Sequence, residues 1–204
     1  MDHYLKKIKS GIGVQFFSDK AGLGDLSTTQ VSLLYAYEAR LNKRTMGRGG
    51  IQLGHVQRKV DFGAFTFGDQ LENGSERSSE GFADARVNYF DVGMGFLVYT
   101  QSTWLGFSST HLNKPNQSLL NNTSPLPTEL KLHGGYKMVF AELESANRRL
   151  SINHSVTFAF NYKKQNKFNQ LDLGIYYNKD LFSLGLWYRG LPFFKPEYNY
   201  ANSD

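Results

Sequence analysis

The 204-residue sequence has no cysteine, only 5 prolines and no long apolar run. Without cysteine, a disulfide framework and thiolate metal sites are excluded. A membrane-spanning helix needs about 20 consecutive apolar residues, and no stretch comes near that length. The mean hydropathy of −0.44 does not exclude a membrane β-barrel, because alternating apolar and polar residues cancel each other in the average.

Positive charge is in modest excess but is not concentrated. The formal net charge is +5 and the pI about 9.3, with Lys and Arg scattered along the chain. We therefore expect a solvated rim of turns and loops, and no nucleic-acid partner. The first residues, MDHYLKKIKSGIG, lack the apolar core of a secretory signal. Either the protein is not exported, or its start has been removed or lies outside this sequence.

Alternation of apolar and small polar residues is the dominant pattern. It is clearest from Leu150 to Lys163, where Ile152, Val156, Phe158 and Phe160 alternate with Ser, Asn, Thr and Ala. Successive side chains of a strand point to opposite faces, so this segment predicts a strand with one apolar and one polar face. Aromatic residues make up 15% of the chain, enough to furnish many such apolar faces.

The same pattern predicts about nine strands separated by connections of unequal length. Short connections are expected near 42–44, 101–103 and 164–167, and long ones at 61–85 and 113–128. Short turns at one end and long loops at the other are typical of outer-membrane barrels. The expected strands are Gly11–Phe17, Ser27–Leu41, Gly49–Arg58, Val87–Tyr99, Trp104–Leu112, Glu129–Glu142, Leu150–Lys163, Phe168–Tyr177 and Leu181–Arg189.

These elements predict an all-β fold: an antiparallel up-and-down transmembrane β-barrel, or a roughly nine-stranded part of one, with residues 1–204 as one domain. Two alternatives remain open. A soluble all-β binding module would bury its apolar faces between two sheets. An outer-membrane channel or small-solute transporter would have a polar lumen, lined by Asp91, Asn153, Asn161, Gln170 and Asp172.

No catalytic constellation is found, so we expect no enzyme, cofactor or metal. His111 and His133 lie on neighbouring expected strands, but a hydrogen-bonded histidine of the wall is favoured over a metal site. Several glycines, Gly47, Gly49, Gly50 and Gly54, lack the strand–loop–helix context of a phosphate cradle and fit barrel bends. Carboxylates gather in one expected solvated loop, at Asp61, Asp69, Glu72, Glu76 and Glu80.

A series of short motifs, in order across residues 10–190, resembles the PorP/SprF family of outer-membrane proteins. The motifs are Gly11-Ile-Gly13, Asp19-Lys-Ala-Gly22, Tyr35-Ala-Tyr37, Asp61 with Phe67-Gly-Asp-Gln70, Phe90-Asp-Val-Gly-Met-Gly95, Gly106-Phe-Ser108 with His111-Leu112 and Pro115, Leu132-His-Gly-Gly-Tyr136, and Leu186-Trp-Tyr-Arg-Gly190.

This resemblance implies a function. The family is associated with the type IX secretion system of the Bacteroidota, and in gliding species with delivery of motility adhesins. It implies a non-enzymatic accessory of the bacterial outer membrane whose partners are lipid, secreted surface proteins or adhesins, and other components of the system. No site residues come with the family. Its members begin with a signal peptide and have more strands, so we expect a fragment or a shortened gene product.

Overall fold

The computed structural model describes residues 2–22, 26–60, 68–73, 85–119, 122–144, 151–179 and 181–190. They form ten strands, a 3-10 turn at Lys6–Ile8 and one short helix, α1 (Gly68–Asn73). The strands are β1 (Asp2–Leu5), β2 (Ser10–Ala21), β3 (Leu26–Arg40), β4 (Met46–Val60), β5 (Ala85–Tyr99), β6 (Thr103–Thr110), β7 (Glu129–Glu144), β8 (Ser151–Gln165), β9 (Phe168–Lys179) and β10 (Phe182–Arg189).

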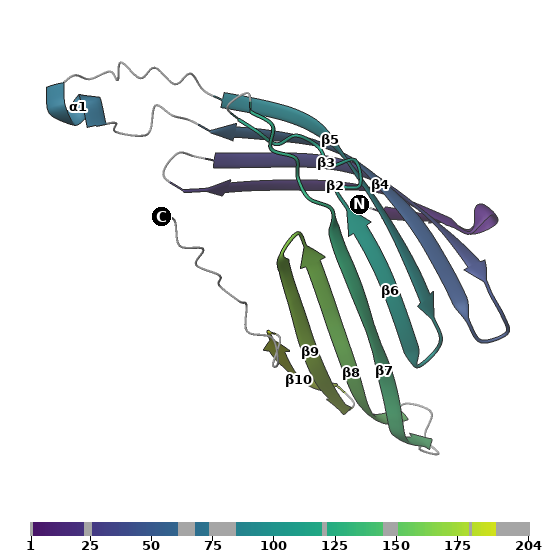
Figure 1. Cartoon of the computed structure of the whole chain (residues 1–204). Helices are drawn as coiled ribbons and strands as arrows, with labels where there is room; N and C mark the ends of the chain where they lie inside the picture. Colours follow the sequence, from purple (N-terminus) through teal and green to yellow (C-terminus); the bar gives the residue numbers. More distant parts are fainter. Residues whose placement is uncertain are drawn as a thin grey trace.

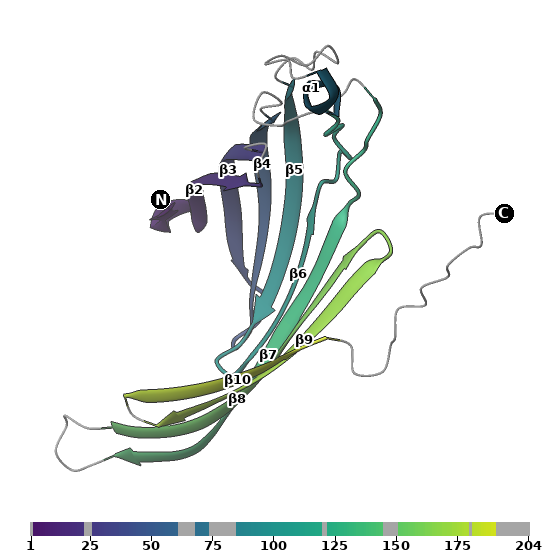
Figure 2. The ribbon, with the colours of Figure 1, turned by 90° about the vertical axis from the view of Figure 1, so that its left-hand side faces the viewer.

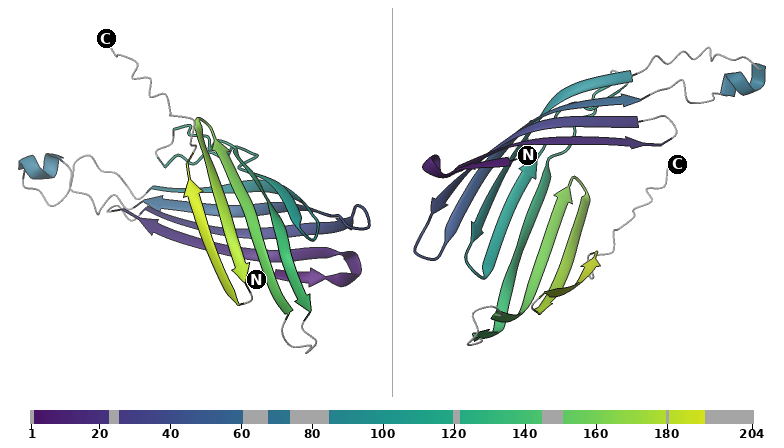
Figure 3. Two further views of the ribbon diagram at one scale, coloured as in Figure 1. Left: turned by 90° about the horizontal axis from the view of Figure 1, so that it is seen from below. Right: turned by 180° about the vertical axis from the view of Figure 1, so that it is seen from behind.

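All ten strands belong to one antiparallel sheet in the order of the sequence, β1 to β10. Figures 1 and 2 show this sheet as a single twisted layer that curves across its width. Among the described residues no pairing joins β1 to β10, so the sheet is open, as Figure 3 also shows. The expected all-β, up-and-down fold is confirmed, in a form consistent with part of a barrel.

The two faces of the sheet differ in chemistry, and we call them the apolar face and the polar face. Register keeps side chains of one kind together across strands: Leu33 of β3 pairs with Leu53 of β4, which pairs with Val92 of β5. On the apolar face large side chains are exposed, with Leu33 61% and Phe90 71% accessible. No second sheet covers this face in the described ranges, so the two-sheet sandwich left open by the sequence is not observed.

No helix among the residues described has the length and apolar character needed to cross a membrane.

Several boundaries differ from those the sequence predicted. Strand β1 was missed because four residues are too few to show alternation, and α1 was missed inside the expected long connection. Strand β6 stops at Thr110 because His111 adopts a left-handed conformation with φ 59°, which a strand does not continue. Strand β7 carries a bulge between Val139 and Ala141, where its register with β8 shifts.

The short connection at 164–167 lies at the same end of the sheet as the long connections, whereas the sequence predicted short turns at the other end. In an up-and-down sheet, connections alternate between the two ends. The β8–β9 turn is therefore at the same end as the two long connections, β4–β5 and β6–β7. Short and long connections are therefore not separated strictly by end. We call the end of the sheet that carries both long connections the long-connection end.

Ring-over-glycine contacts explain the motif Leu132-His-Gly-Gly-Tyr136. On the polar face, the ring of His133 lies over Gly106 of β6, and the indole of Trp104 lies over Gly135 of β7. On the apolar face, Phe160 of β8 lies over Gly134, with Cε1 2.8 Å from where a Cβ would stand. Because glycine has no side chain, an aromatic ring from the neighbouring strand can pack directly on its backbone, as is seen in other sheets.

Candidate functional site

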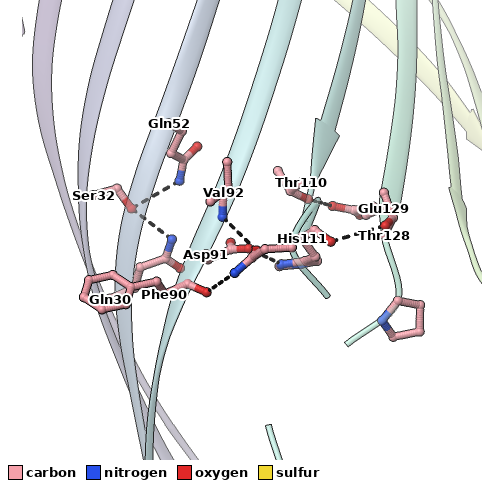
Figure 4. A network of polar contacts seen from close by, with 12 residues as sticks. Gln30, Ser32, Gln52, Phe90, Asp91, Val92, Thr110, His111, Thr128 and Glu129 are labelled. Carbon is pink, nitrogen blue, oxygen red and sulfur yellow. Dashed lines mark hydrogen bonds and ion pairs between the residues drawn. The ribbon is translucent and has the colours of Figure 1, made fainter. Parts of the chain in front are cut away.

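The main polar site lies on the polar face at the long-connection end, and it starts at Asp91 of β5. This residue is only 5% exposed, and its Oδ1 lies 2.8 Å from Nδ1 of His111, just beyond β6 (Figure 4). A buried carboxylate is costly unless it is hydrogen-bonded. The left-handed turn at His111 places the imidazole where it satisfies Asp91.

Asn113 closes the top of the β5–β6 pairing with its side chain. Its Nδ2 donates to the carbonyl oxygen of Phe90 at 2.7 Å, and its Oδ1 accepts from the backbone N–H of Val92 at 3.2 Å. The backbone N–H of Leu112 also donates to the Val92 carbonyl oxygen, at 3.0 Å. The side-chain amide thus occupies the place that a further residue of β6 would take along β5.

The β6–β7 connection is folded on itself. The side-chain oxygen of Asn116 accepts from the backbone N–H groups of Ser118, at 3.1 Å, and Ser124, at 2.9 Å. Asn116 also forms an isolated bridge with Pro125. Such local side-chain bonds stabilise turns that the backbone alone would leave open.

The same connection is tied to strands on either side of it. Arg58 of β4 donates from Nη1 to Oε1 of Gln117 at 2.6 Å. Gln165 of β8 donates to the carbonyl oxygen of Pro127 at 3.0 Å. Because β4 and β8 are separated by three strands, the connection crosses the polar face at this end of the sheet.

Further polar contacts surround these anchors. Ser32 of β3 is 1% exposed and accepts hydrogen bonds from Gln30, at 2.9 Å, and Gln52, at 3.2 Å (Figure 4). On the other side, Glu129 of β7 accepts from Thr110 at 3.2 Å and pairs with Lys131 at 2.5 Å. The site is a network of satisfied amide, hydroxyl and carboxylate groups.

A second polar cluster lies on the polar face at the opposite end of β3–β5. Glu38 contacts Nη2 of Arg48 at 2.5 Å and accepts from the hydroxyl of Tyr99 at 2.7 Å. The guanidinium of Arg48 also lies 5.9 Å from the centre of the Tyr99 ring. Side-chain hydrogen bonds and an ion pair thus connect three adjacent strands there.

The two histidines singled out in the sequence are not brought together. Thr110, next to His111, pairs with Glu129, whereas His133 pairs with Gly106. Four residues along β7 separate these positions, roughly 13 Å at the rise of a strand. Within the described ranges, no group of three or more His, Asp or Glu side chains could hold a metal ion.

The remaining sequence candidates are placed as follows. Asn161 and Asp172 are register partners, and Gln170 donates to Asp172 at 2.7 Å, so these share the polar face with Asp91. Asn153 pairs through its backbone with Glu142. Of the five loop carboxylates, Asp61, Glu76 and Glu80 lie outside the described residues, while Asp69 and Glu72 belong to α1.

Sequence reasoning missed Asn113, Gln117 and the ring-over-glycine pairs. The pairs had a signal, since glycines and aromatic residues alternate on neighbouring strands. Asn113 and Gln117 had none, because their bonds depend on how the connection returns to the sheet. Taken together, the described contacts stabilise and shape one end of the polar face, and none of them positions a nucleophile beside a base.

Comparison with models of protein families gives a match. The family model described as type IX secretion system membrane protein PorP/SprF matches residues 1–203, essentially the whole chain. No curated protein matches. The family resemblance drawn from the ordered motifs is therefore confirmed.

Proposed function

Because the chain belongs to the PorP/SprF family of type IX secretion system membrane proteins, we propose that it is a non-enzymatic accessory of protein export in the bacterial outer membrane. In this role it supports the export or surface attachment of adhesins and gliding-motility proteins. The observation that carries the proposal is the exposed apolar face of a single antiparallel sheet. The chain's family is one of secretion-system membrane proteins.

The apolar face supports insertion as a β-sheet. Phe90, Phe96, Leu105 and Leu186 are between 52% and 71% exposed on this face, which no described element covers. In hydrocarbon every backbone polar group must be bonded, and strands β2 to β9 have a paired neighbour on both sides. Outer-membrane lipid is the partner whose chemistry fits such a surface, with residues 1–204 acting as one domain.

The polar face and the long-connection end support a role in contact with other proteins. The β6–β7 connection is shaped by its own hydrogen bonds and anchored on β4 and β8, so it presents a defined surface. Family membership brings other type IX components as partners, and the secreted surface proteins are the cargo we propose.

A gene deletion in the native host tests this function. We expect the mutant to retain less adhesin at the cell surface, with recovery when the gene is restored. Restoring a version that carries Ile51→Arg, which places a charge on the apolar face, should not rescue display, whereas Gln52→Arg on the polar face should. Unchanged display in the deletion mutant, or recovery of the protein in the soluble fraction, would overturn the proposal.

A further inference from the structure

Strand β5 extends well beyond its neighbour β6. Pairing between them covers only Met94–Tyr99 on β5, whereas β5 begins at Ala85. Asn113 closes the ladder at Phe90 and Val92, and the chain then passes over the polar face, where Gln117 meets Arg58 of β4. On the other side, β4 pairs with β5 along its whole length, up to Val60 and Ala85. The first residues of β5 therefore form an edge beside the end of β6.

The backbone groups on this edge can be assigned from the alternation of an antiparallel ladder. Successive residues direct their N–H and C=O groups to opposite neighbours. Both backbone groups of Val92 bond toward the β6 side, to Asn113 and Leu112. The N–H of Phe90 and both backbone groups of Asn88 and Arg86 therefore point to the same side as those of Val92. The structure gives these groups no hydrogen-bond partner in the part of the chain that it describes.

The edge begins where the apolar face ends. Along β5, the apolar face carries Val92 and Phe90 and then changes to Asn88 and Arg86, both exposed. The neighbouring β4 positions change in the same way, from Leu53 to polar residues. An unpaired edge is excluded from hydrocarbon but is tolerated in water. Strand β6 thus ends at the level where the apolar face ends and backbone groups of β5 no longer need a partner strand.

The charge at this edge selects the side chains of an added strand. Arg86 is exposed and forms no ion pair in the described structure. Opposite charges that face each other on adjacent strands are favourable, whereas like charges are unfavourable. A strand pairing with Arg86 is therefore favoured when it carries carboxylates on that face.

From this geometry we propose that the Arg86–Phe90 edge of β5 binds an extended, acidic segment of a secreted protein by strand addition. Main-chain bonds to Arg86, Asn88 and Phe90 supply affinity, and carboxylates beside Arg86 supply selectivity. The identity of the partner as cargo rests on the proposed function. The edge itself rests only on the register and hydrogen bonds of β4, β5 and β6.

A peptide-binding experiment tests the edge. The full chain is folded in detergent micelles, and binding is followed by anisotropy of a fluorescein-labelled peptide, Glu-Val-Glu-Val-Glu-Val. We expect saturable binding at least tenfold tighter than for Lys-Val-Lys-Val-Lys-Val. Arg86→Glu should reverse this preference. Equal binding of the two peptides, or none, overturns the proposal.

Two further measurements separate strand addition from charge alone. Asn88→Pro removes an N–H on the open side and the side-chain hydrogen bond from Gln57, but it leaves the backbone ladder with β4 intact. It should therefore fold and weaken binding of the acidic peptide at least tenfold. If this variant does not fold, N-methylation of alternate peptide residues replaces it. One of the two N-methylation registers should then abolish binding and the other should not. Insensitivity to both changes would overturn strand addition.

The other occupants of the edge have distinct outcomes. Peptide binding that appears only after deletion of residues 65–80 would assign the edge to the chain itself, and a stable dimer lost in Asn88→Pro would assign it to a second copy. Either result overturns the proposal. If Asn88→Pro loses peptide binding but still displays adhesin normally, the partner of the edge is not the cargo. The function proposed above would stand, and the gene deletion tests it separately.

Discussion

The indole of Trp104 lies across Gly135 of the neighbouring strand, on the polar face of the sheet. Two strands meet at this point with no room for a side chain on β7. The carbonyl oxygen of Phe158, on β8, would stand 2.6 Å from a Cβ at Gly135, and the indole would be closer still. The contact joins β6, β7 and β8.

Gly135→Ala should therefore destabilise the sheet. The new methyl group meets backbone on one side and a packed ring on the other, so an overpacking cost of about 1–3 kcal/mol is expected. The free energy of unfolding of the protein in lipid vesicles, measured by tryptophan fluorescence against urea, would show it. Gly11→Ala is the control, since the nearest atom to a Cβ there is 3.9 Å away. Equal stabilities of the two variants would contradict this account.

His111→Ala should expose the cost of the Asp91 carboxylate. The carboxylate is almost inaccessible and loses its 2.8 Å partner, so about 1–3 kcal/mol of stability should be lost. The double variant Asp91→Ala/His111→Ala should cost less than the sum of the two single changes, because no carboxylate is then left unpaired. Additive effects in this cycle of urea titrations would show that the two side chains are not coupled.

Much of the sheet could be predicted because its strands are two-faced. The alternation in β3, β5 and β8 sets each strand and also its orientation, and their predicted residues agree with the structure to within a few positions. The pattern was ambiguous in β4, where Val56 lies on the face opposite Ile51. Val56 is 3% exposed, so it is buried on the polar face and obeys the alternation of the strand.

The site could not be predicted in the same way, because its contacts are made by residues that leave the pattern. His111 ends β6 through a left-handed turn, which a sequence of alternating residues does not indicate. Asn113 acts as a substitute for a strand residue only because β5 continues past β6. The sequence correctly placed Asp91 and Asp172 on the polar face, but which groups they contact depends on the register of non-adjacent segments.

Asn113→Ala should loosen the top of the β5–β6 ladder. Two hydrogen bonds to backbone groups of β5 are lost, at about 0.5–1.5 kcal/mol each. Asn113→Asp is the informative comparison, because a carboxylate can still accept from the Val92 N–H but cannot donate to the Phe90 carbonyl oxygen. Hydrogen exchange of the Val92 amide should be fast in the alanine variant and slower in the aspartate variant. Equal exchange in all three proteins would exclude this role for Asn113.

Ile51 and Gln52 provide an adjacent pair that tests which face of the sheet meets lipid. Ile51 is 53% exposed, and its partner Met94 is central in the apolar stretch of β5, so Ile51→Arg should cost about 2–4 kcal/mol in lipid vesicles. Gln52→Arg adds the same charge one residue along, on the polar face. It loses the bond to Ser32, at about 0.5–1.5 kcal/mol. The larger loss of unfolding free energy should belong to Ile51→Arg. The reverse order would place the polar face against lipid and remove the physical basis of outer-membrane insertion.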